Sequence, residues 1–150
     1  MSNRNAVVAH YLDGRVLKGH TQDFSPQHPN FHILSLEGGL GVHVLCRDLK
    51  ALFFVKDFVG NHERRDVRGF ISGPSETAQG KKLAVRFKDG ELLCGYSLSY
   101  STDRDGFFMF PSDAGSNNLR VYVVLSSTVE VKAGPGAEAM AQKALGDRAA

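Results

Sequence analysis

Apolar and polar positions alternate along most of the chain, and this alternation predicts strands. Val7, Ala9 and Tyr11 lie at every second position, which is the period of a β-strand with one buried face. Similar short runs predict further strands at 16–24, 31–34, 42–46 and 49–55. An alanine-rich stretch near the end, 137–145, is interpreted as a frayed tail or a short helix. The pattern therefore predicts an all-β fold with a short flexible or helical C-terminal tail.

One segment of the pattern occurs twice. Tyr11–Leu34 and Phe87–Phe110 share an aromatic residue, one residue, Asp-Gly, four residues, Gly, and an aromatic five residues later. Asp-Gly between apolar runs predicts a tight hairpin with positive φ at both central positions. The offset between the copies is constant up to one insertion near Asn117-Asn118, after which Val121 takes the place of Val44.

The repeat predicts two similar units of about five strands each. Their bounds are 6–58 and 83–132, with a basic, Gly-rich connector at 59–82 and a tail at 133–150. Units this small bury little apolar surface alone, so we expect them to pack against each other. The pattern leaves open whether they form two separate barrels or share one sheet system.

The repeated segment resembles the first half of an Sm-like domain through its D-G-R, x-x-x-G, aromatic and Asn-apolar-x-apolar-Leu positions. The resemblance implies small, strongly bent Sm-like or SH3-like β-barrels, and in that family the subunits form rings that bind RNA. The usual Asp after the aromatic of the second strand is Ser25 and Ser101 here, and the later Arg-Gly motif is missing. RNA binding by the Sm route is therefore not expected.

A second resemblance begins in the connector. Arg64, Arg65 and Arg68 form R-x-x-x-R ahead of a β-unit, and Ser101 and Asp103 follow in S-x-D-x-x-G. This order is similar to PilZ domains, in which an Arg-rich loop and a D/N-x-S-x-x-G motif bind cyclic di-GMP. Guanidinium groups make bidentate contacts with phosphate and stack on bases. The resemblance implies a cyclic di-nucleotide site at these five residues.

The run G-F-F-M-F-P-S-D-A-G-S-N-N-L-R-V, together with the repeats, also resembles an uncharacterised family of bacterial proteins, often deltaproteobacterial. Some members of that family accompany signalling domains. The resemblance covers nearly the whole chain, and it implies no established activity.

Composition narrows the functional classes. The formal net charge of +2 lacks the excess expected of a non-specific nucleic-acid binder. Cys46 and Cys94 form no ligand or disulfide motif and are expected to be reduced core thiols. Neither a signal peptide nor an apolar run long enough for a membrane span is visible, so we expect a cytoplasmic protein without a membrane partner.

Candidate chemistry is sparse. Five of the six histidines correspond to a different residue type in the second copy, which favours surface or packing roles and no metal site. No nucleophile motif, acid–base pair or phosphate loop is present, so we expect no catalytic residues and no cofactor. Adjacent aromatics such as Phe107 and Phe108 must point to opposite faces, which predicts packing between the repeats. Asn117 and Asn118 mark a turn where the copies differ, and Arg120 beside them is a candidate ligand contact.

These observations predict a non-enzymatic binding or adaptor protein, with bacterial signalling as a possible setting. Its partner is another protein or a second copy of the chain. The alternatives are a PilZ-like cyclic di-GMP receptor and an Sm-like RNA-binding protein. The candidate ligand-binding residues are Arg64, Arg65, Arg68, Ser101, Asp103, Asn117, Asn118 and Arg120.

Overall fold

A computed structural model describes residues 5–58, 76–77, 80–98, 100, 104–111 and 118–149. The strands of the first repeat are β1 (Asn5–Tyr11), β2 (Val16–Thr21), β3 (Asn30–Ser35), β4 (Gly41–Leu45) and β5 (Leu49–Val55). Those that follow are β6 (Glu76–Thr77), β7 (Gly80–Phe87), β8 (Leu92–Ser97), β9 (Gly106–Pro111), β10 (Asn118–Val124) and β11 (Thr128–Ala133). A helix, α1 (Pro135–Ala149), ends the chain. The predicted all-β fold with a short helical tail is confirmed.

Both Asp-Gly turns are present, but their conformation differs from the prediction. Gly14 and Gly90 have φ of 93° and 91°, whereas no other residue type among those described has positive φ. The amide of Gly14 donates to the carbonyl of Tyr11 at 3.1 Å, which closes a turn with Leu12 and Asp13 at its centre. Because the loop has four residues between the strands, only glycine needs positive φ, and Asp13 instead accepts from the amide of Arg15 at 3.0 Å.

The strand pairings correct the predicted alignment of the repeats. Asn30 pairs with Leu45 in the first repeat, and Gly106 pairs with Val124 in the second. Because Asn30 and Gly106 begin equivalent strands, Val124 is the equivalent of Leu45. Val121 therefore matches Val42, two positions before the predicted Val44. Three residues, rather than one, are inserted between the third and fourth strands of the second repeat, and the sequence pattern contains no signal to count them.

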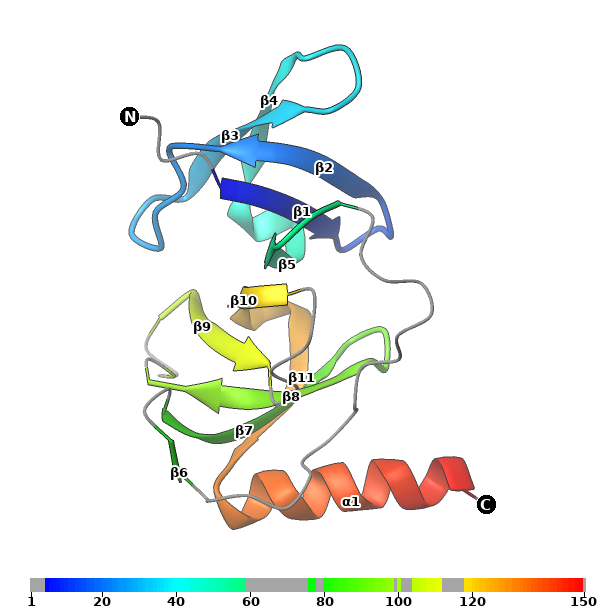
Figure 1. The fold of residues 1–150 in the computed structure, drawn as a ribbon. Helices are drawn as coiled ribbons and strands as arrows, with labels where there is room; N and C mark the ends of the chain where they lie inside the picture. The colour runs from blue at the N-terminus through cyan, green and yellow to red at the C-terminus, as the bar shows by residue number, and fades with distance from the viewer. Residues whose placement is uncertain are drawn as a thin grey trace.

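The two repeats form one continuous ladder of antiparallel strands, in the order β11-β7-β8-β9-β10-β5-β1-β2-β3-β4, with β6 beside β7. Each repeat contributes five strands, in the orders β5-β1-β2-β3-β4 and β11-β7-β8-β9-β10. They join where β10 pairs with β5, for example Tyr122 with Leu52. Figure 1 shows the repeats one above the other, with β5 and β10 between them.

The joining strands contribute side chains to two cores. The first core contains Leu52 and Phe54 of β5 together with Tyr122 and Val124 of β10. The second core contains the residues between them in sequence: Ala51, Phe53 and Val55 of β5 and Val121 and Val123 of β10. Successive strand residues point to opposite faces, so each repeat fills part of the core of the other. The prediction that adjacent aromatics pack between repeats is confirmed, since Phe108 packs against the first core and Phe107 lies in the second.

A glycine in the second strand of each repeat allows close approach of the third strand. A Cβ atom at Gly19 would lie 2.2 Å from the carbonyl oxygen of Leu34, and one at Gly95 would lie 2.2 Å from that of Phe110. Neither separation is compatible with van der Waals contact, so both positions require glycine. The shared glycine of the sequence pattern therefore has the same structural cause in both units.

Two contacts hold the repeats together at the ends of the joining strands. The buried Lys50 Nζ lies 2.6 Å from Asp89 Oδ2 and 3.3 Å from Glu91 Oε1, on the Asp-Gly turn of the other repeat. The Arg120 guanidinium carbon lies 4.4 Å from the ring centre of Phe54 and 4.6 Å from that of Phe108. Both cations bridge the repeats.

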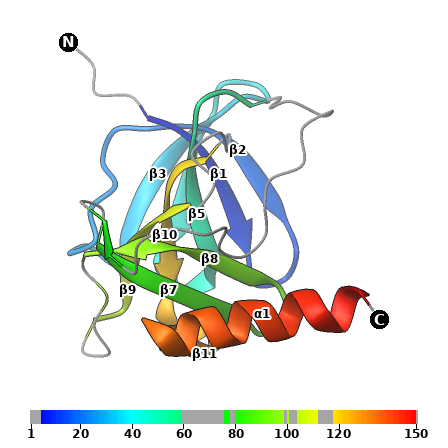
Figure 2. The same ribbon diagram turned by 60° about the horizontal axis from the view of Figure 1, so that its bottom comes forward.

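Helix α1 packs against the outer face of the second repeat. Ala137, Met140 and Ala141 are buried against Ala84 and Cys94, and the Lys82 ammonium donates to the carboxylate of Glu138. Figure 2 shows the helix across β7 and β11. The frayed-tail interpretation is wrong at these positions, because alanine lets the helix approach the sheet without a wide apolar stripe. No helix among the described residues is long and apolar enough to cross a membrane.

Candidate functional site

A pocket of about 760 Å³ lies at the junction between the repeats. The first repeat contributes Pro29 and Asn30 at the start of β3, Leu45 at the end of β4, and Cys46 and Arg47 of the short 3-10 turn that follows. The second repeat contributes Arg104 and Asp105 before β9, Tyr122 and Val124 of β10, and Leu125 and Ser126 of its own 3-10 turn. We call this site the junction pocket.

The two sides of the junction pocket are built by equivalent parts of the repeats. The amide of Cys46 donates to the carbonyl of Pro29 at 2.9 Å, and the amide of Leu125 donates to that of Asp105 at 2.8 Å. Each bond fixes a 3-10 turn against the start of the third strand in its own repeat. The pocket therefore follows from the repeat itself: two strand ends of the same kind meet across the β5–β10 pair.

The floor of the pocket is apolar and its rim is polar. Tyr122 and Val124 are buried, and Leu45, Cys46 and Leu125 are half-buried. Burial raises the pKa of Tyr122 to about 12, and it also raises the pKa of the Cys46 thiol. Both groups are therefore neutral near pH 7, so the floor presents no charge to a ligand. A neutral, apolar floor of this kind favours the binding of small apolar groups.

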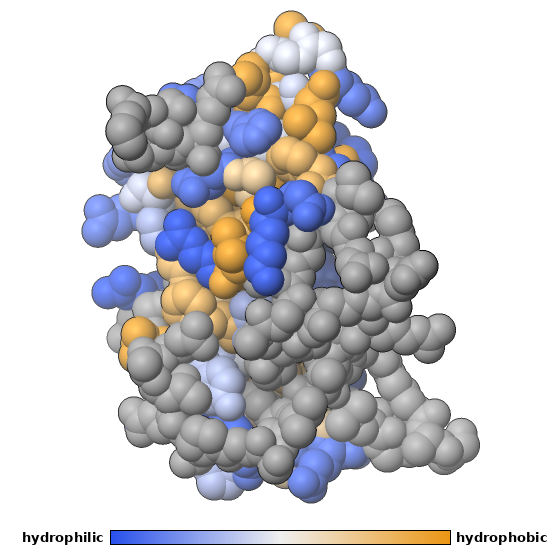
Figure 3. Space-filling model, in the orientation of Figure 1, coloured by the Kyte–Doolittle hydropathy of each residue, from blue (hydrophilic) through white to orange (hydrophobic). Residues whose placement is uncertain are grey.

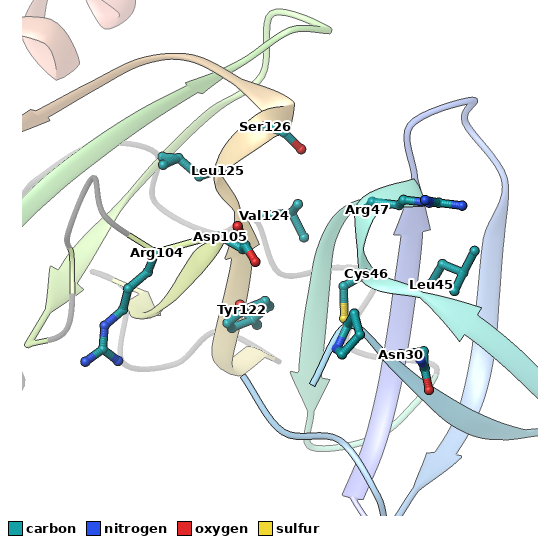
Figure 4. A pocket seen from close by; sticks show the side chains of 11 residues that line it. Asn30, Leu45, Cys46, Arg47, Arg104, Asp105, Tyr122, Val124, Leu125 and Ser126 are labelled. Carbon is teal, nitrogen blue, oxygen red and sulfur yellow. The ribbon is translucent and has the colours of Figure 1, made fainter. Parts of the chain in front are cut away.

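Two arginines provide positive charge at the rim. Arg104 and Arg47 are both exposed, and Asn30, Asp105 and Ser126 complete the rim. Figure 4 shows Arg47 and Arg104 on opposite sides of Tyr122, each on a different repeat. Asp105 lies next to Arg104 and lowers the net positive charge of that side. A ligand with an apolar body and anionic groups at its ends would match this distribution.

Most of the site residues predicted from sequence lie outside the described residues. This applies to Arg64, Arg65, Arg68, Ser101, Asp103 and Asn117. The backbone of Asn118 pairs with Val55 at the start of β10. Arg120 is half-buried between Phe54 and Phe108, outside the residues that line the pocket, and burial lowers its pKa. Its position indicates a role in joining the repeats.

Sequence reasoning missed the lining of the junction pocket. The predicted alignment, in which Val121 takes the place of Val44, matches Cys46 to Val123 on a buried strand face. The structure places Cys46 in the 3-10 turn instead, where it is half-exposed and equivalent to Leu125. His43 is equivalent to Tyr122 rather than to Arg120. In the corrected alignment of the fourth strands, the floor residues Leu45 and Val124 occupy matching positions, and this is the signal that could have located the pocket.

The described part of the chain offers little for metal binding or nucleophilic catalysis. No group of three His, Cys, Asp or Glu side chains there is close enough to hold a metal ion. A thiol of raised pKa such as Cys46 is a poor nucleophile near neutral pH.

The chain belongs to a family of unknown function (DUF6982), whose model matches residues 3–133. The match covers both repeats and ends with β11, so α1 lies beyond it. Comparisons with curated proteins and with solved structures found no match.

Proposed function

We propose that the chain is a non-enzymatic binding or adaptor protein, and that its junction pocket holds an apolar group of the ligand or partner. The observation that carries the proposal is a pocket of about 760 Å³ with a neutral, apolar floor between two arginine-bearing rims. Pockets with this composition, a few polar groups around an apolar floor, are typical of small-molecule and side-chain recognition. The floor contains no ionised group to drive acid–base chemistry.

The first test uses 8-anilinonaphthalene-1-sulfonate, a probe with an aromatic body and one anionic group. We expect saturable binding with one site per chain, measured by fluorescence titration. Ser126→Trp adds a large side chain at the exposed rim and should weaken binding about tenfold or more by filling the pocket. Leu119→Trp is the matched control, since Leu119 is exposed outside the pocket lining. Equal affinity in both variants would exclude the junction pocket as the site.

Charge at the rim is tested separately. Arg47→Ala should weaken sulfonate binding severalfold and reduce its dependence on salt, because one cation near the anionic group is removed. Arg15→Ala is a suitable control, since Arg15 is exposed and already paired with Asp13 at 2.7 Å on a hairpin turn. An unchanged affinity for Arg47→Ala would limit the proposal to the apolar floor.

A PilZ-like cyclic di-GMP receptor is the second candidate. It is supported by sequence continuity: Arg104 and Asp105 of the pocket rim follow directly after Ser101 and Asp103 of the PilZ-like motif. Calorimetry with cyclic di-GMP tests it, with Arg104→Ala and the double variant Arg64→Ala/Arg68→Ala. No heat at high micromolar ligand, or binding unchanged in both variants, would remove this candidate. RNA binding has no comparable support.

The same proposal assigns a fold class and a setting. In each repeat the fifth strand lies beside the first, and a glycine lets the second strand bend close to the third, which supports the Sm-like or SH3-like class. A cytoplasmic setting is supported by the free thiols Cys46 and Cys94. A role in bacterial signalling rests on the family resemblance of the sequence.

A further inference from the structure

The fourth strands of the two repeats are equivalent, but their outer edges have different neighbours. β10 pairs with β9 on one side and with β5 on the other. β4 pairs with β3 in the same register as β10 with β9. Within the described part of the chain no strand lies along the other edge of β4. The second repeat therefore shows which kind of strand pairs with the outer edge of a fourth strand.

Some backbone polar groups of β4 point to this edge, where no strand of the described residues pairs with them. Ser35 donates to Leu40 and Cys46 donates to Pro29, both at 2.9 Å, so even-numbered residues of β4 face β3. Successive strand residues alternate in direction. The amide and carbonyl groups of His43, with those of Gly41 and Leu45, therefore face the outer edge. Their equivalent in β10, Tyr122, pairs with Leu52 of β5.

Apolar side chains surround this edge. Leu34, Leu36 and Leu40 of the β3–β4 hairpin are 37%, 49% and 70% exposed. Figure 3 shows apolar residues gathered at this end of the molecule. An exposed strand edge next to apolar side chains is a template for pairing with another strand.

Among the described residues β11 also has one edge without a neighbouring strand, but β11 lacks the chemistry of a partner for β4. β11 is equivalent to β5, but Glu130 and Lys132 occupy the positions of Ala51 and Phe53, which lie in the second core. A second copy adding β11 to β4 would turn these charges toward the core of the first repeat. Burying such charges without partners costs several kcal/mol. A second copy is therefore disfavoured as an occupant that adds its β11 strand.

We propose that the β4 edge binds an extended segment of another protein by antiparallel strand addition, and that the segment resembles β5. Its chemistry is a run of about seven residues that are apolar on both faces, as in L-K-A-L-F-F-V of Leu49–Val55. The expected register follows from the internal pair: partner residues equivalent to Leu52 and Phe54 lie opposite His43 and Gly41. Backbone bonds supply affinity, and the exposed leucines supply apolar contacts.

The test uses a synthetic peptide with the β5 sequence and two lysines added at each end. We expect one peptide to bind per chain and to protect the amides of Gly41, His43 and Leu45 from hydrogen exchange. His43→Pro should weaken binding about tenfold or more, because proline removes an outward amide while leaving the bonds to β3 intact. Exchange data on the unmodified chain keep the test valid if that variant folds poorly.

Two controls test which strand edge binds the peptide and which peptide sequence that edge prefers. Ala133→Pro places the same change on the exposed β11 edge and should leave peptide binding unchanged. A peptide with the β11 sequence T-V-E-V-K-A should bind at least tenfold more weakly than the β5 peptide. Failure of the β5 peptide to bind would overturn the proposal. Equal binding to His43→Pro, or protection of β10 amides in place of β4 amides, would also overturn it. Gly41 and His43 lie outside the lining of the junction pocket, which the sulfonate titration tests separately.

Discussion

The inner junction and the outer edges of this chain are made of the same strands of the repeat, yet they differ in chemistry. All seven residues of β5 are buried, from Leu49 to Val55. Its equivalent β11 has an exposed or half-exposed residue at every position, and Val129 is 60% exposed where Lys50 is buried. The repeat therefore specifies where the strands form. Whether the residues of a strand are apolar or charged depends on what packs against its edge.

The contacts that bridge the two repeats also differ between the inner junction and the outer edges. Lys50 and Arg120 are found only at the inner junction, where they meet Asp89 and the rings of Phe54 and Phe108. The equivalent positions at the outer edges are Val129 and Gly41, which cannot form these contacts. The inner junction therefore has bridging cations, whereas among the described residues the outer edges are either charged, as in β11, or without a neighbouring strand, as in β4.

The largest effect is expected from copying an outer-edge residue into the junction. Ala51 has 0% exposure between the two cores, and its equivalent is Glu130. Ala51→Glu should lower the free energy of unfolding by about 4 kcal/mol or more, because it buries an unpaired charge in a packed site. The reverse change Glu130→Ala should alter it by less than about 0.5 kcal/mol. Urea unfolding measures both, and similar losses in the two variants would contradict the comparison.

The next largest effect on stability is expected where the second and third strands of each repeat approach each other closely. Gly19→Ala and Gly95→Ala each place a methyl group 2.2 Å from a carbonyl oxygen. We expect each to lower the free energy of unfolding by about 3 kcal/mol. Gly41→Ala is the control, because no atom lies within 4 Å of its Cβ position and its φ is not positive. If only one of the two repeats were sensitive, the structural equivalence of the glycines would be wrong.

The arginine at the junction should have a smaller effect. Arg120→Met keeps a long apolar stem but removes the cation from between Phe54 and Phe108. The expected loss in the free energy of unfolding is about 1 kcal/mol. The opposite change at the open edge, Gly41→Arg, should give no gain, since no aromatic pair is placed to receive it there. A gain of comparable size would show that the edge is not chemically distinct.

The smallest effect is a pH dependence at the junction. Burial, and to a lesser extent Lys50, lower the pKa of His10 below 6.5 in the folded chain. The unfolded chain therefore binds a proton at His10 more readily than the folded chain does. As a result, the contribution of neutral His10 to the free energy of unfolding is present above about pH 6.5 and declines as the pH falls below it. His10→Gln should flatten the stability profile between about pH 7 and pH 5. An unchanged slope of the free energy of unfolding against pH would show that other ionisable groups control this dependence.

Local patterns predicted the strands well because each depends on a few neighbouring residues. Leu49–Val55 was predicted at its observed bounds, and both Asp-Gly turns were located. The pairing of β5 with β10 could not be predicted, because it depends on contacts between residues far apart in sequence. The junction pocket needs that pairing and the corrected alignment of the fourth strands. The predicted arginine site at Arg64 and Arg68 lies outside the described residues and stays a prediction.

The central claim is that β5 and β10 make the two cores depend on each other. Native-state hydrogen exchange of the Phe53→Ala variant tests this most directly, because Phe53 belongs to a strand of the first repeat but lies in the second core. We expect the slowest amides of β1–β3 and of β7–β9 to lose the same free energy of opening, about 3 kcal/mol. A loss confined to one repeat, with the other unchanged, would contradict the claim.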